Sequence, residues 1–161
     1  MRLAIACDHR GHSAKERLIP LLRKAGHEVV DFGCDGTAAC DYPDYAAPLS
    51  RAVGAGDYDA GILLDGSGIG MCVVANKING IRAALAHDEF TARRAREHNH
   101  CNVLCIGTDL LNQDQIHTIV QIFLSTPFAD GRHSLRVAKI AEIEATNGNG
   151  HPNAKLQHVK S

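Results

Sequence analysis

The chain has 161 residues, 45% of them hydrophobic, and this length and composition predict one globular domain with a substantial core. Its formal net charge of -1 predicts no general attraction to nucleic acid or to an anionic membrane surface. No apolar stretch approaches the roughly 18–20 residues of a membrane span, and the first residues are typical of a strand rather than an export signal. We therefore expect a cytoplasmic protein without nucleic-acid or membrane partners.

The six cysteines and ten histidines raise the possibilities of a disulfide framework and of a metal site. The chain has neither a Cys-x-x-Cys pair nor an export signal, so we expect reduced thiols, most of them buried. His9 with His12, and His98 with His100, have spacings that occur in metal sites. Neither pair has a flanking third ligand or a His-Glu-x-x-His pattern, so we expect no metal.

Short β-rich runs alternate with amphipathic stretches, a pattern typical of a parallel sheet covered by helices. Strands are expected at residues 2–7, 28–32, 58–64, 81–86 and 103–106. The intervening segments and the region after the last strand are expected to be helical. The last helix should run from near residue 131 to about 145, so we expect one domain over residues 1–145 and a mobile tail over 146–161.

Several of the expected helices carry end signals. Ser13 and Glu16 have the spacing of a capping box, and Gly26 would end the helix that they begin. Asp88 and Asn112 stand where two later helices would need an N-cap. These signals support a helix after the first, fourth and fifth strands.

Five strands with right-handed crossovers predict a three-layer, doubly wound (Rossmann-like) α/β fold. The ligands of such sheets bind beyond the carboxyl ends of the strands. Asp8 and His9 follow the first strand, residues 65–70 follow the third, and Thr108 and Asp109 follow the fifth. We expect these polar groups to gather at one edge of the sheet.

The most informative segment is 61–70, Gly-Ile-Leu-Leu-Asp-Gly-Ser-Gly-Ile-Gly, an apolar run that breaks into alternating glycines. It is typical of a buried strand that leads through a glycine loop into a helix, whose unpaired N–H groups can hold a phosphate or an oxyanion. Asp65 stands where a carboxylate could move a proton. The plainer interpretation is a tight turn with a solvated aspartate, which a glycine loop alone does not exclude.

Basic residues mark two further places. Arg132, His133 and Arg136 begin the last helix, where guanidinium groups one turn apart suit a phosphate dianion, although a solvated basic face is the commoner fate of such residues. His98 ends an earlier basic helix, where the dipole favours an imidazolium that could act as a general acid. It could also be a capping histidine, with Asn99 in the left-handed turn.

A series of motifs lies between residue 1 and about 145: Cys7-Asp8-His9-x-Gly11, Asp41-Tyr42-Pro43, Gly66-Ser67-Gly68-Ile69-Gly70, Ala75-Asn76-Lys77, Gly80-Ile81-Arg82-Ala83, Arg96-Glu97-His98-Asn99, Asn102-Val103-Leu104 and Gly131-Arg132-His133-x-x-Arg136. Taken in this order, they resemble the type B ribose-5-phosphate isomerase and galactose-6-phosphate isomerase family. The resemblance implies a cofactor-free aldose–ketose isomerase that acts on a phosphosugar through a cis-enediolate, with ribose 5-phosphate as the default substrate.

The resemblance also implies roles for the motif residues. His98, from the partner subunit, would open the sugar ring. The enediolate oxygen would be stabilised by Ser67 and by the amides of Gly66, Gly68, Ile69 and Gly70. Sugar hydroxyls would be held by Asp8, Tyr42 and Asn99, with Asp109 near the substrate. The phosphate would be surrounded by His9, Arg132, His133 and Arg136. The protein would be a homodimer or a dimer of dimers with composite sites.

Two positions depart from the family pattern. Many members have a catalytic cysteine where this chain has Asp65, and another branch has a glutamate where this chain has Met71. A thioether cannot act as a base, so Asp65 is the expected base, while Cys72 should face the opposite side of its helix. Asp109 occupies a position that is arginine in the family, which leaves a tetrose, deoxypentose or hexose phosphate open as the substrate.

Two other classes of function stay open. A glycine loop after a strand can belong to a nucleotide- or flavin-binding module, but the third glycine of Gly-x-Gly-x-x-Gly is absent and Met71 stands in its place. The chain could also be a catalytically silent homologue with a structural or interaction role. The ionisable Asp65 at the base position argues against silence.

Overall fold

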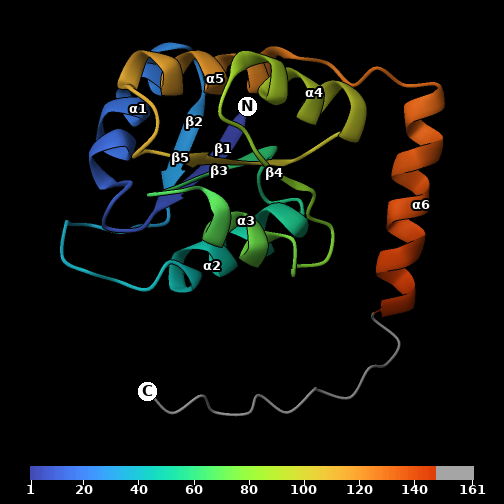
Figure 1. Ribbon diagram of the computed structural model, residues 1–161, viewed down its shortest axis with the longest axis horizontal. Coiled ribbons are helices and arrows are strands. Elements are labelled where there is room, and N and C mark those ends of the chain that lie inside the picture. The colour runs from blue at the N-terminus through green and yellow to red at the C-terminus, as the bar shows by residue number, and fades with distance from the viewer. Residues whose placement is uncertain (148–161) are drawn as a thin grey trace.

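The computed structural model describes residues 1–147. Its elements follow in the order β1 (Arg2–Cys7), α1 (His12–Lys24), β2 (Glu28–Asp31), α2 (Pro43–Gly54), β3 (Ala60–Asp65), α3 (Ile69–Ala75), β4 (Ala83–Leu85), α4 (Glu89–Asn99), β5 (Val103–Gly107), α5 (Gln113–Ser125) and α6 (Arg132–Asn147). The strands form one parallel sheet in the order β2-β1-β3-β5-β4 (Figure 1). The predicted doubly wound α/β fold is confirmed.

Helices cover both faces of the sheet, which gives the predicted three layers. Helices α1, α4 and α5 lie on one face and α2 and α3 on the other (Figure 1). Along β1, Leu3 and Ile5 pack under the first set of helices, while Ala4 and Ala6 pack under the second. Because both faces are covered, strands such as β3 are buried along their whole length. Their apolar residues therefore do not have to alternate with polar ones.

The strand order reverses between β1 and β3. From β1 the chain moves outward to β2 on one side, and from β3 it moves to the edge strand β4 on the other side and then returns to β5, between β3 and β4. Ligands of doubly wound sheets bind outside the carboxyl ends of the strands at such a switch point. Cys7 on β1 pairs with Leu64 on β3, and Asp65 pairs with Gly107 on β5. Residues 8, 65 and 108 therefore leave the sheet at one edge, as the sequence predicted.

The structure corrects one of the predicted helix starts. Helix α1 begins after Gly11, and no side chain caps it, so the capping box predicted for Ser13 and Glu16 is wrong. The carboxylate of Asp8 instead fixes the turn between β1 and α1, because its Oδ1 accepts the N–H groups of Arg10 at 2.8 Å and Gly11 at 3.0 Å, both before the first residue of the helix.

The predicted caps of α4 and α5 are confirmed, since Asp88 and Asn112 each form a complete capping box. The edge strand β4 is shorter than the predicted 81–86, because it pairs only with β5, and only along three residues. All six cysteines are free, and Cys7, Cys34, Cys101 and Cys105 are buried, as predicted.

Helix α6 stands at one side of the three layers and packs against α4 (Figure 1). It ends at Asn147, two residues beyond the predicted boundary at 145. The remainder of the predicted tail, residues 148–161, lies outside the described residues. Within residues 1–147, no helix is both long and apolar enough to cross a membrane.

Candidate active site

Asp65 ends β3 with its carboxylate turned into the glycine loop, and only 4% of the residue is exposed. Its Oδ1 accepts the N–H of Gly68, and its Oδ2 accepts the N–H of Met71 at 3.3 Å. Burial raises the pKa of Asp65 and the nearby Asp8 carboxylate adds to the rise, although the amide donors oppose both effects. A buried carboxylate with a raised pKa is suited to accept a proton and return it near neutral pH.

The glycines of the loop 66–70 let other elements approach it closely. Gly68 has a φ of 78°, and a Cβ at this position would lie 2.9 Å from the backbone nitrogen of Gly107 on β5. A Cβ at Gly70 would lie 2.9 Å from the ring of Tyr42. The ring of Tyr42 therefore packs directly against the backbone of the loop, and it is partly exposed.

Asp8 and His9 lie at the end of β1, next to Asp65. Because Asp8 Oδ1 accepts the two amides of the turn before α1, Oδ2 is the oxygen left to accept a substrate hydroxyl. His9 Nδ1 accepts the N–H of Cys40 at 3.4 Å. A neutral His9 in this arrangement carries its proton on Nε2, which then can donate to a ligand.

Lys15 is a positioning residue that the sequence analysis missed. It is 1% exposed, and its Nζ contacts Asp31 Oδ2 at 2.7 Å and the carbonyl oxygen of Cys34 at 2.8 Å. These contacts hold the start of the loop that runs from β2 to α2 and carries Tyr42. A signal was present in the sequence, because Lys15 falls on the apolar stripe of α1 with Leu18.

Arg10 is a second residue that the sequence analysis missed. Its Nε and Nη2 donate to Asp109 Oδ2 at 2.9 and 2.6 Å, and this ion pair raises the pKa of Arg10. The pair lies against Gly66, where a Cβ would be 2.8 Å from both Arg10 Nε and Asp109 Oδ2. Asp109 is therefore beside the glycine loop, as predicted, but it is already paired with a cation. The ends of β1 and β5 were expected at one edge of the sheet, but no pattern in the sequence pairs Arg10 with Asp109.

The other predicted site residues gather where the end of α4 meets the start of α6: His98, Asn99, Arg132, His133 and Arg136. The rings of His98 and His133 stack with their centroids 4.1 Å apart, and Arg94 Nη1 lies 2.9 Å from His98 Nε2. Burial lowers the pKa of His133, and His98, Arg132 and Arg136 lower it further. This histidine–arginine cluster concentrates positive charge, which suits an anionic ligand.

The end of α4 differs from one of the alternatives considered from the sequence. His100, with a φ of 49°, takes the left-handed conformation at the C-cap, so the assignment of this turn to Asn99 is wrong. The backbone oxygen of Asn99 accepts a hydrogen bond from Arg82 Nε at 3.1 Å. His98 therefore lies inside the last turn of the helix, with its side chain directed toward His133.

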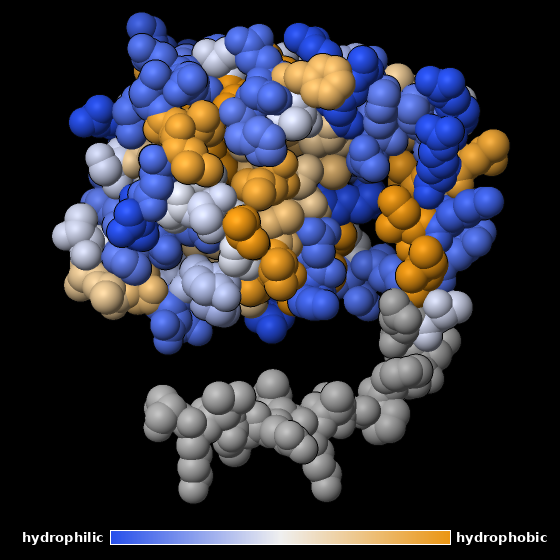
Figure 2. All heavy atoms as spheres, viewed as in Figure 1, coloured by the Kyte–Doolittle hydropathy of each residue, from blue (hydrophilic) through white to orange (hydrophobic). Residues whose placement is uncertain are grey.

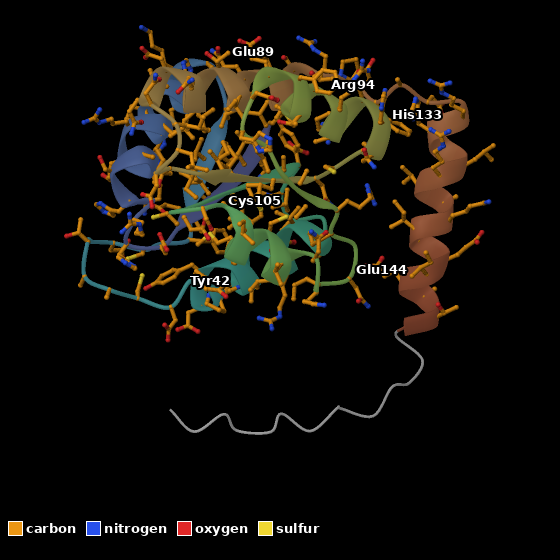
Figure 3. All side chains as sticks on the ribbon, viewed as in Figure 1. Tyr42, Glu89, Arg94, Cys105, His133 and Glu144 are labelled. Carbon is orange, nitrogen blue, oxygen red and sulfur yellow. The ribbon has the colours of Figure 1, made fainter. Side chains whose placement is uncertain are left out.

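The histidine–arginine cluster and Asp65 lie at opposite ends of the strands of the sheet. In a parallel sheet each helix runs back toward the starts of the strands, so α4 ends near the start of β5, opposite the edge that carries Asp65. In Figure 3, His133 and Tyr42 lie on opposite sides of the molecule. One chain therefore brings Asp8, His9, Tyr42, residues 65–70 and Asp109 together, but not with the cluster.

Comparison with known proteins shows what this arrangement is similar to. The model of the Ribose/Galactose Isomerase family matches residues 3–140. This chain belongs to that family. YwlF of Bacillus subtilis, which is named as a candidate sugar phosphate isomerase, is 44% identical over 148 residues, 91% of this chain and 99% of that protein. The chain is accordingly a sugar-phosphate aldose–ketose isomerase of this family, and the predicted resemblance is confirmed.

Relatives within the Ribose/Galactose Isomerase family differ in the sugar for which they are named. D-erythrulose-4-phosphate isomerase of Pectobacterium atrosepticum is 37% identical over 145 residues, 89% of this chain and 95% of that protein. The structure of Clostridium thermocellum ribose-5-phosphate isomerase B has a TM-score of 0.89 and 41% identity, over 91% of this chain and 99% of that one. The family is thus shown, while its members do not fix one substrate.

Besides Asp8, Cys72 is a further ionisable group close to the candidate base of this family member. Its Sγ lies 3.6 Å from the carbonyl oxygen of Ala83 and 3.6 Å from Asn76 Nδ2. Hydrogen bonding to Cys105 is the main cause that lowers the pKa of Cys72 to about 7. Its contacts on β4 and β5 make it a necessary control for any test of Asp65. Among residues 1–147, no three His, Cys, Asp or Glu side chains lie close enough together to hold a metal ion.

Proposed function

We propose that this isomerase interconverts ribose 5-phosphate and ribulose 5-phosphate through a cis-enediolate, with Asp65 as the base. The observation that carries this proposal is the buried Asp65 carboxylate, whose pKa is raised, at the switch point of the sheet. The Clostridium thermocellum relative, which is named for ribose 5-phosphate, supports the choice of sugar.

The proton moves between neighbouring carbons. Asp65 removes the proton from C2 of the open-chain aldose, and the electron pair of that bond forms the C1–C2 double bond while charge moves onto O1. Asp65 then returns the proton to C1, and the O2 hydroxyl proton passes to O1 as C2 becomes the carbonyl. One carbon is oxidised as its neighbour is reduced, so the balance needs no external oxidant.

The glycine loop would stabilise the enediolate oxygen. In the unliganded chain the Gly68 amide donates to Asp65, and the Ile69 amide donates to Ser67 Oγ at 3.2 Å. We therefore assign the oxyanion to the amide of Gly70 and the hydroxyl of Ser67, with the amides of Gly66 and Ile69 beside them. Donors fixed by a backbone turn need little reorganisation as the charge develops.

We further propose a homodimer in which the histidine–arginine cluster of one chain completes the Asp65 site of the other. A six-residue strand such as β3 spans about 20 Å, far more than the distance from C2 to the phosphate of a pentose. One chain therefore cannot offer Asp65 and the cluster to one substrate molecule. A two-fold partner would supply His98 for ring opening, Asn99 for a hydroxyl and Arg132 for the phosphate.

Exposed apolar side chains support this pairing (Figure 2). On α3, Ile69 and Val73 are 58% and 54% exposed, and on α6 Leu135 is 71% exposed. A groove of about 810 Å³ separates α6 from the body of the domain. Glu144 of α6 bridges it by accepting the N–H of Gly80 at 2.8 Å. A second copy of the chain would remove this apolar surface from water.

Mixing inactive subunits tests the composite site directly. Asp65→Asn and His98→Asn homodimers should each be inactive with ribose 5-phosphate. After proven subunit exchange, one site in each mixed dimer receives both intact residues, so activity should reappear at up to half the wild-type value per mixed dimer. No recovery would mean that each chain builds a complete site of its own.

A second candidate is the same chemistry on a four-carbon sugar phosphate. Two observations favour it: Asp109 stands where the family has an arginine, and the Pectobacterium atrosepticum relative is named for erythrulose 4-phosphate. Assays over four- to six-carbon aldose and ketose phosphates, without added metal or cofactor, decide between them by kcat/KM. No turnover of any of these sugars would favour a silent homologue or a nucleotide-binding module.

A further inference from the structure

We propose that Arg10 and Asp109 act as one hydroxyl-binding pair, which contacts the sugar chain between the reacting carbons and the phosphate and thereby determines substrate specificity. This inference rests on the proposed function of the Asp65 site. It adds Arg10 to the site and gives Asp109 a defined chemical task.

The backbone holds both members of the pair beside the candidate base. Asp109 N–H donates to the carbonyl oxygen of Gly66 at 3.1 Å, and the neighbouring Thr108 N–H donates to that of Asp65 at 2.8 Å. Arg10 N–H donates to Asp8 Oδ1 at 2.8 Å. The two side chains thus approach the loop from β1 and β5 and meet over Gly66, next in sequence to Asp65. The ion pair therefore lies beside the carboxylate that would receive the substrate proton.

The unused atoms of the pair match a hydroxyl group. Arg10 Nε and Nη2 both donate hydrogen bonds to a single oxygen, Asp109 Oδ2. Within the described part of the chain, neither Arg10 Nη1 nor Asp109 Oδ1 has a hydrogen-bond partner. The side chains are 56% and 44% exposed, so both atoms can reach a ligand. A hydroxyl both donates and accepts, and can therefore bond to a guanidinium and a carboxylate together.

A phosphate is the poorer fit to this pair. The pair carries no net charge, and the Asp109 carboxylate would repel a dianion that approached Arg10. In the histidine–arginine cluster, Arg132 and Arg136 are exposed, and the carboxylate that acts on His133, Glu97, already forms an ion pair with Arg94 at 2.7 Å. The two ends of a phosphosugar would thus meet different chemistry, with hydroxyls at the pair and the phosphate at the cluster.

The test combines substrates that lack one hydroxyl with enzyme variants that lack one member of the Arg10–Asp109 pair. Steady-state kinetics would use ribulose 5-phosphate and its 3-deoxy and 4-deoxy analogues, which are open-chain ketoses and so need no ring opening. Arg10→Met removes the charge at similar length, Asp109→Asn keeps the shape, and Arg10→Lys restores a cation. Arg2→Met is the matched control, because Arg2 also forms an exposed ion pair, 3.4 Å from Glu28, at the other edge of the sheet.

We expect Arg10→Met and Asp109→Asn each to lower kcat/KM for ribulose 5-phosphate about tenfold or more, mainly through KM. With one of the two deoxy sugars this loss should vanish, since the hydroxyl that the pair binds is already gone. Arg10→Lys should recover part of the loss. Inhibition by inorganic phosphate should be unchanged in all three variants, and Arg2→Met should behave as the wild type.

Three results would overturn the inference. An equal loss on all three sugars would show a structural role only, and thermal unfolding would then reveal it. No loss would show that the pair does not touch the substrate. Weaker inhibition by phosphate in Arg10→Met would make Arg10 a phosphate ligand instead. If the wild-type enzyme turned over no sugar phosphate at all, the proposed function would fail as well, so the two failures are distinguishable.

Discussion

The edge of the sheet around Asp65 and the histidine–arginine cluster are built differently. At the edge, the carboxylates of Asp8 and Asp65 are buried and accept hydrogen bonds from backbone amides. In the cluster, Arg132 and Arg136 are exposed, and His98 is held by side chains that stack on it or donate to it. The base is thus fixed by the backbone of its own chain, while the cations stay accessible.

This difference follows from what each group has to do. Desolvation raises the pKa of a carboxylate and makes it a stronger base near neutral pH, and a single folded chain can bury it in advance. Guanidinium groups stay charged in water and need no burial until an anion arrives. In the proposed homodimer, one chain would preorganise the proton transfer and assembly would add the phosphate site.

The largest expected effect comes from removing the base at the edge. Asp65→Asn keeps the shape of the side chain but cannot take up the proton, so kcat should fall about 10²–10⁴-fold while thermal unfolding shows an intact fold. Cys72→Ala is the matched control, since the pKa of the nearby Cys72 is lowered to about 7, and it should remain active. Near-normal turnover by a well-folded Asp65→Asn enzyme would remove Asp65 from the mechanism.

A change in the histidine–arginine cluster should affect cyclic substrates more than open-chain substrates. This difference distinguishes the role of the cluster from that of the edge around Asp65. His98→Asn should lower kcat/KM for cyclic ribose 5-phosphate about 10²-fold, because a general acid for ring opening is lost. Erythrose 4-phosphate cannot close into a five-membered ring, because its C4 oxygen is esterified. Its turnover, if the panel shows any, should change far less. Equal losses on both aldoses would place His98 in the enediolate step instead.

The sequence was most informative where one local pattern determines one local structure. The apolar run before the glycines predicted β3 and the loop, and Asp88 and Asn112 predicted two helix caps, because each of these signals acts over a few residues. The meeting of strand ends was predictable as well, since in a parallel sheet it follows from topology alone.

Contacts made between distant segments were not predictable in this way. Arg10 and Asp109 are separated by most of the domain and meet only because β1 and β5 flank β3. A single chain also gives no direct signal of which of its surfaces a second copy will cover.

A smaller effect is expected from the cations of the cluster. Arg132→Ala and Arg136→Ala should each raise KM and weaken inhibition by inorganic phosphate. Each charged hydrogen bond that is lost should weaken the binding free energy of the phosphate by about 1.5–3 kcal/mol. Arg17→Ala, a change of an exposed arginine on α1, is the control and should alter neither constant. If an unphosphorylated sugar suffered the same loss as the phosphosugar, the two arginines would be structural.

The smallest expected effect is a displacement of the pH profile that leaves turnover near neutrality almost intact. Because burial raises the pKa of Asp65, the side chain stays protonated to a higher pH than an ordinary aspartate, whose pKa is about 3.9. Activity needs the carboxylate, so kcat/KM should fall as the pH drops through this raised value. The second ionisation of the substrate phosphate, near pKa 6, could produce a similar fall of kcat/KM at low pH, the acid limb of the pH profile. Asp65→Cys separates ionisation of the base from ionisation of the substrate. A thiol base should move the limb upward, toward about 8.5, whereas a limb that belongs to the substrate would not move.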